Sequence, residues 1–111
     1  MTAEPGQDLL QKLRHRDAVV RRQAARAIGV SRLKEGVREL MQVLEEDNSA
    51  PVRRAAAEAL GKIGDPAARG PLERALRAES DAGVRQEAMA ALARLGGGTG
   101  DYPGSLPVSE E

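Results

Sequence analysis

The sequence contains no cysteine, no phenylalanine and no tryptophan, and its single aromatic residue is Tyr102. Without cysteine the chain has no disulfide, no thiolate metal site and no thiol nucleophile. The core must be built from alanine, leucine, valine and isoleucine, which favours closely packed helices over a sheet sandwich. No hydrophobic run approaches the roughly 20 residues of a membrane-spanning helix, and the first residues do not resemble a signal peptide. These absences predict a soluble, cytoplasmic, helical protein that does not use a membrane.

An excess of charge of one sign is also missing, because 17 basic residues balance 17 acidic ones over 111 residues. The overall charge therefore gives no reason to expect nucleic acid or an acidic membrane as a partner. Along the chain the balance is uneven: residues 1–34 carry eight bases and three acids (net +5), and the remaining 77 carry nine bases and fourteen acids (net −5). Such a basic end could steer an acidic partner or bring copies together head to tail, although a solvated basic end is the simpler expectation.

What the chain has in abundance is one helical pattern written three times. The clearest copy is residues 51–66 (PVRRAAAEALGKIGDP), where apolar residues recur at three- and four-residue steps. Gly64 can close this helix in the left-handed conformation, and the Asp-Pro pair after it can start the next helix. The pattern recurs at a period of 32 residues, as its valines show: Val20, Val52 and Val84.

A second, leucine-bearing helix precedes each copy of this pattern. Its leucines are Leu9 and Leu13, then Leu40 and Leu44, then Leu72 and Leu76. A helix–turn–helix unit of this size cannot bury its apolar face alone, and about three stacked units are the minimum for stability. We therefore predict a flexible lead-in (1–7), a repeat domain (8–96, with repeats at about 8–30, 35–64 and 67–96) and a Gly-rich linker with a tail (97–111). The tail is either flexible or a docking segment that uses Tyr102, Leu106 and Val108.

At these residues the sequence resembles the HEAT-like repeats named after phycobilisome (PBS) lyases. The signature is a Leu-x-x-x-Leu helix, an Asp-bearing turn, Val-Arg-x-x-Ala-Ala-x-Ala-Leu-Gly-x-Ile-Gly and Asp-Pro, and residues 51–66 match it almost letter for letter. The first copy departs from it at residues 29–31, and the third has Met89 for the second alanine and Ala93 for glycine. The resemblance covers residues 8–96.

The resemblance implies an all-α fold, a right-handed α-α superhelix (solenoid) of three HEAT-like helix-turn-helix repeats, similar to armadillo arrays. The first helices would lie on the convex side, at about 8–15, 35–46 and 67–79. The second helices would line the concave side, at about 17–30, 50–63 and 82–95. Asp8 is the expected N-cap of the helix at about 8–15.

Several residues recur because of the scaffold itself. The resemblance implies that Arg21, Arg53 and Arg85 form a ladder to carboxylates and carbonyls of the turns. The acids available for this ladder are Asp17, Asp47, Asp65 and Asp81. Gly61 lies inside a helix, where it costs roughly 1 kcal/mol relative to alanine, so we expect a close backbone crossing at that point.

The sequence shows no catalytic constellation. Its only histidine, His15, lies between two arginines at a helix end, where a solvated turn residue is expected. Metal-dependent hydroxylases built on related repeats need several His-Glu pairs around iron, and this chain has none. We therefore predict no enzymatic activity, no cofactor and no metal site.

The remaining candidate is the concave face, where we predict a protein-binding surface for a scaffold, an adaptor or a regulator. It comprises the residues between the core positions of the second helices: Arg22, Gln23, Arg26, Arg54, Ala55, Glu58, Lys62, Gln86, Glu87, Ala90 and Arg94. Arginine is enriched at interface anchors, and the small Ala55 and Ala90 would leave depressions.

Three alternatives stay open. The resemblance suggests a bilin lyase-like subunit or chromophore chaperone, for which three repeats and one aromatic residue are a poor fit. Self-association through the terminal repeats is suggested by Met89, Leu92 and Leu95, which no later repeat would cover. Nucleic-acid binding is the least favoured, because the basic cluster spans one repeat and aromatic residues for base stacking are missing.

Overall fold

The structure, a computed structural model, describes residues 5–96, and the regular elements in that range are all helices. The first helices of the three repeats are α1 (Pro5–Lys12), α3 (Val37–Glu46) and α5 (Arg69–Ala78). The second helices are α2 (Ala18–Val30), α4 (Ala50–Ile63) and α6 (Ala82–Gly96). Short 3-10 turns, η1 (Lys34–Gly36) and η2 (Pro66–Ala68), lead into α3 and α5.

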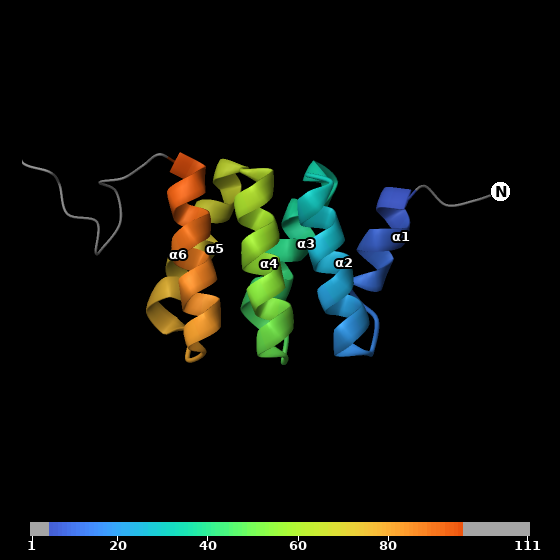
Figure 1. Ribbon diagram of the computed structural model, residues 1–111, viewed down its shortest axis with the longest axis horizontal. Coiled ribbons are helices and arrows are strands. Elements are labelled where there is room, and N and C mark those ends of the chain that lie inside the picture. The colour runs from blue at the N-terminus through green and yellow to red at the C-terminus, as the bar shows by residue number, and fades with distance from the viewer. Residues whose placement is uncertain (1–4, 97–111) are drawn as a thin grey trace, which may run out of the picture.

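The six helices form the two layers of an α-α solenoid (Figure 1). The second helices stand side by side, with α4 between α2 and α6, and the first helices lie against them on one face. Each repeat therefore packs chiefly on its neighbour. The predicted fold class is confirmed.

The start of the first repeat differs from the prediction. Asp8 was expected to cap a helix that begins there, but α1 begins at Pro5 and Asp8 lies within its first turn. Residues 5–7, which the sequence placed in the lead-in, are therefore helical. The reason is the fixed φ of proline, which suits the first position of a helix, where its missing N–H would have no partner.

Gly64 and Asp65 act at helix ends as predicted, and Asp17, named above only as an acid for the ladder, also caps a helix. The Asp17 carboxylate accepts from the Val19 N–H at 2.8 Å and caps α2. Gly64 closes α4 in the left-handed conformation with φ of +78°. The Asp65 carboxylate accepts from the Ala67 N–H at 2.9 Å, and so caps η2, the turn that precedes α5.

The core is a layer of aliphatic side chains between the first and second helices. Its largest fully buried members are Leu13, Ile28, Leu40, Leu44, Val52, Leu60, Leu72, Val84 and Leu92. Burying each such side chain contributes about 1.5–3 kcal/mol, which is how three short repeats hold together without aromatic residues.

Adjacent second helices cross at glycine. A Cβ added at Gly29 would lie 2.7 Å from the Cα of Ala59, and one added at Gly61 would lie 2.9 Å from the Cα of Ala91. Such distances leave no room for a side chain, so the close crossing predicted at Gly61 is confirmed. Gly29 makes the same crossing one repeat earlier.

The outer face of α6 is less open than predicted. Leu92 is 1% exposed and belongs to the core, and Leu95 is only partly exposed. Met89 is 49% exposed, whereas its equivalents Ala25 and Ala57 are fully buried beneath the following helix. Of the three apolar residues named for this face, Leu92 was wrongly assigned, because it points into the layer between α5 and α6.

Candidate protein-binding surface

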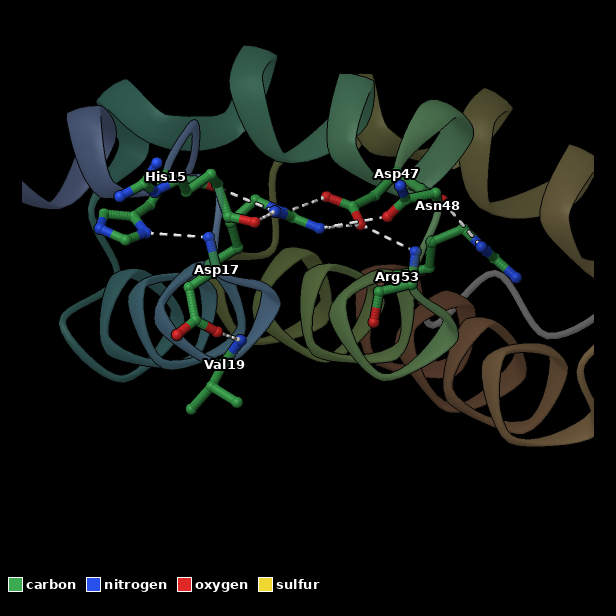
Figure 2. Close-up of polar contacts among 9 residues, drawn as sticks. His15, Asp17, Val19, Asp47, Asn48 and Arg53 are labelled. Atoms are coloured by element: carbon green, nitrogen blue, oxygen red, sulfur yellow. Dashed lines mark hydrogen bonds and ion pairs between the residues drawn. The ribbon is translucent and has the colours of Figure 1, made fainter.

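One set of arginines is held by the turns of the solenoid. Arg21 donates from Nε and Nη2 to the two carboxylate oxygens of Asp47, at 2.8 and 3.1 Å. Its Nη1 donates to the carbonyls of His15 and Arg16. Figure 2 shows Asp47 and Asn48 in the turn after α3, with His15 and Asp17 in the turn before α2. This bidentate pair links the first repeat to the second.

Arg53 repeats this arrangement one repeat later, with a partner that the sequence reasoning missed. Its Nε and Nη2 donate to the Glu79 carboxylate at 3.0 and 2.8 Å, and its Nη1 donates to the carbonyl of Asp47. The period contains the missed signal, since Glu79 lies 32 residues after Asp47. Asp81, one of the acids proposed for the ladder, instead accepts from the Val84 N–H at 3.0 Å near the start of α6.

His15 belongs to the same series. The equivalent positions His15, Asp47 and Glu79 each accept a hydrogen bond from the backbone N–H two residues later, at 2.9, 2.9 and 3.1 Å. The only histidine is therefore a turn residue of the first repeat, which agrees with its expected role.

Pairing shifts the ionisation of the ladder. The hydrogen bond from Arg53 is the main cause that lowers the pKa of Glu79, with burial acting in the opposite direction. The pKa values of Arg21 and Arg53 are raised, chiefly by their hydrogen bonds to Asp47 and Glu79. These pKa shifts favour the charged forms of Arg21, Arg53 and Glu79 near neutral pH, in which the pairs hold the turns together.

A second set of charged residues lies over a hollow on the face formed by the second helices. The hollow has a volume of about 500 Å³ and is lined by Arg22, Arg26, Ala50, Pro51, Arg54, Ala55, Glu58, Asp81 and Glu87. A neighbouring hollow of about 210 Å³ is lined by Glu58, Gly61, Glu87, Ala90, Ala91 and Arg94. Helices α2, α4 and α6 all contribute to this surface.

Eight of the eleven predicted surface residues line these two hollows. Of the other three, Gln23 and Gln86 are exposed, and Lys62 pairs with Glu58 at 3.5 Å between Nζ and Oε2. Ala55 is 4% exposed and forms part of the floor of the larger hollow, whereas Ala90 is exposed. The sequence reasoning missed Ala50, Pro51 and Asp81, which come from the turns at the helix starts.

The larger hollow has walls of opposite charge. Arg22 and Arg26 lie one turn apart on α2, and within residues 5–96 neither has an acidic group within 4 Å. Arg54 approaches Glu87 only loosely, at 3.9 Å between Nε and Oε2, and its side chain is 58% exposed. Glu58 and Glu87 lie on the α4 and α6 side.

Val30 adds an apolar element that the sequence reasoning did not include. It is 69% exposed and occupies in α2 the position of Lys62 in α4 and Arg94 in α6. The surface therefore combines charged side chains with an accessible aliphatic group.

Residues 5–96 contain no group of three or more histidine, cysteine, aspartate or glutamate side chains that could hold a metal ion. No helix within the same range has the length and hydrophobicity needed to span a membrane.

The helix pairs, the arginine ladder and the glycine crossings define a helical repeat protein. A family model of HEAT repeats matches residues 6–93, and the chain belongs to this family. A comparison with curated proteins finds no match. HEAT repeats are generally non-enzymatic modules for protein interaction, so the partners of this chain are expected to be proteins.

Proposed function

We propose that this protein is a non-enzymatic scaffold, adaptor or regulator that binds another protein on the face formed by α2, α4 and α6. The observation that carries this proposal is the division of the arginines. Arg21 and Arg53 are held by carboxylates in the turns, whereas Arg22, Arg26 and Arg54 surround an open hollow. Arginines whose donors remain available are suited to carboxylates and carbonyls of a partner chain.

The chemistry of the hollow favours a polypeptide over a pigment. Sites for large apolar ligands are lined mostly by apolar and aromatic side chains. Here six of the nine lining residues are charged. Membership of the phycobilisome-lyase group and attachment of a bilin chromophore therefore gain no support from this surface.

The same lining disfavours nucleic acid. Three acidic side chains, Glu58, Asp81 and Glu87, share the hollow with its three arginines. A phosphate backbone requires a continuous basic surface, because neutralising phosphates supplies most of the affinity. A polypeptide with both charges satisfies these walls better.

Affinity capture from the native cell tests the proposed surface. The bait is the full chain, compared with a variant in which Arg22, Arg54 and Arg94 are replaced by glutamate. We expect the partner recovered by the wild type to be lost from this variant, because a charge reversal at interface arginines both removes bonds and adds repulsion.

A matched variant replaces the exposed cations Lys34, Arg38 and Arg77 by glutamate, which changes the net charge equally away from the hollows. This control is expected to recover the partner at the wild-type level. Equal recovery by all three proteins would contradict the assignment of the surface.

A further inference from the structure

We propose that the larger hollow recognises an extended segment that carries one acidic and one basic side chain about three residues apart. The inference rests on the proposed function and adds the chemistry of the partner. The α2 wall presents Arg22 and Arg26, and the opposite wall presents Glu58 and Glu87. The acidic side chain lies against the first wall and the basic side chain against the second.

The arginine wall is ready for a carboxylate. Arg22 and Arg26 lie on the same side of α2, since residues four apart are neighbours on a helix surface. Both are exposed, and no acidic group of residues 5–96 lies within ion-pair distance of them. Two guanidinium groups on neighbouring positions favour an anion with more than one oxygen acceptor.

The acidic wall is occupied only loosely by the protein itself. Arg54 lies 3.9 Å from Glu87, and Lys62 lies 3.5 Å from Glu58 on a side chain that is 31% exposed. Partly exposed pairs with such long separations are weak, so a cation of the partner can compete for the carboxylates. Arg54 is then free to turn toward the partner's acid.

The spacing follows from the helices. Neighbouring helix axes lie about 8–10 Å apart, and an extended chain advances about 3.3 Å per residue. An acid opposite α2 and a base opposite Glu58 on the neighbouring α4 are therefore separated by about three residues. Ala55 and Pro51 keep the floor between the walls low, so an extended backbone fits there.

The test uses the full chain and labelled octapeptides of alanine and serine that carry one aspartate and one lysine at separations of one to five residues, in both orders. Fluorescence anisotropy measures their binding. We expect the peptides with a separation near three to bind up to about fivefold more tightly than versions with glutamine at either charged position, which is the factor that one exposed ion pair can contribute.

A charge-swapped pair of proteins makes the test specific. The R22E/R26E variant is expected to lose this preference and to favour the peptide whose aspartate is replaced by lysine, which loss of folding would not produce. The R38E/R77E variant, changed on α3 and α5 away from the hollow, is expected to bind as the wild type does.

Two results would overturn the inference: equal binding, or no binding, of all the octapeptides by the wild type, and an R22E/R26E variant that keeps the wild-type preference. Either result leaves the proposed function standing if the cellular partner is still lost from the Arg22, Arg54 and Arg94 variant. Recovery of the partner by that variant removes the proposed function itself.

Discussion

Arg53 and Arg54 are adjacent in the sequence and differ in what holds them. The Arg53 guanidinium is bound by both oxygens of Glu79 and by the carbonyl of Asp47, and its side chain is 17% exposed. The Arg54 guanidinium lies over the hollow with a loose contact to Glu87. Of these two adjacent residues on α4, Arg53 therefore stabilises the fold, and Arg54 belongs to the candidate binding surface.

This difference predicts opposite results for the same substitution. Arg53→Gln leaves the Glu79 carboxylate, only 10% exposed, without its cation, so we expect a loss of about 2–3 kcal/mol in the free energy of unfolding. Arg54→Gln removes an exposed contact and should change that free energy by less than about 0.5 kcal/mol. Urea denaturation measures both values. Similar losses for the two variants would contradict the division of the arginines.

Glu79 also predicts a dependence on pH. Its pKa in the folded protein is lowered below the ordinary value of 4.5, so its contribution to stability is present above that pH. The contribution is lost as the pH falls below 4.5 and through the folded pKa, because the carboxylate must then be protonated. We expect the difference in unfolding free energy between the wild type and Glu79→Gln to shrink over that window.

Exposed Glu46 provides the control for this measurement. The Glu46→Gln variant should follow the pH dependence of the wild type. A wild-type advantage over Glu79→Gln that stays constant as the pH falls would show that ionisation of Glu79 does not stabilise the fold.

At the scale of the helices, two glycines differ in how closely a neighbouring helix approaches them. A Cβ at Gly61 would meet the backbone of Ala91, whereas one at Gly70 would find only the end of the Arg74 side chain, at 3.6 Å. Gly61 therefore permits a close helix crossing, and Gly70 occupies open space in α5. A change to alanine gains helix propensity at both positions. At Gly70 packing does not oppose this gain, whereas at Gly61 the clash with Ala91 opposes it.

We therefore expect Gly61→Ala to destabilise the protein by about 1–3 kcal/mol, although alanine is the better helix former. Gly70→Ala should be neutral or stabilising by a few tenths of a kcal/mol. Thermal unfolding followed by circular dichroism compares the two. A gain in stability at Gly61 would contradict the close crossing.

The helix pattern and the close crossing at Gly61 could be predicted from the sequence because they depend on spacing alone. The boundaries could not, since η1, η2 and the first turn of α1 depend on local competition between hydrogen bonds. The partner of Arg53 was missed because only aspartates were considered, although Glu79 lies at the period. The shape of the hollow could not be predicted, because it depends on which side chains from three helices meet. The periodicity of the sequence shows only which face of its helix each residue occupies.

At the scale of the whole molecule, the outer face of α6 is unsuited to another repeat. Ala93 stands where α2 and α4 have Gly29 and Gly61, and its Cβ would fall where a neighbouring helix passes. Met89 stands where the other helices have small, buried alanines. We therefore expect self-association by continued stacking to be disfavoured in the natural sequence.

Restoring the two small residues should reverse this. The double variant Met89→Ala, Ala93→Gly is expected to associate head to tail. In this association α2 of one copy packs on α6 of the next copy in the same way that α4 packs on α2 within one chain. Sedimentation velocity over a range of concentrations measures the association. The single variant Met89→Ala keeps the obstructing Cβ and serves as the control. A double variant that sediments as the wild type does at every concentration would contradict this account.

The contacts between neighbouring repeats join residues at the same sequence separations in both pairs of repeats, and these separations influence how the chain folds. The bonds from Arg21 to Asp47 and from Arg53 to Glu79 both span 26 residues, and both glycine crossings span 30. Each docking step therefore closes a loop of nearly the same length, and the entropy cost of loop closure depends on that length. The central repeat, whose α4 packs on both α2 and α6, can act as the template from which ordering spreads in both directions at similar rates.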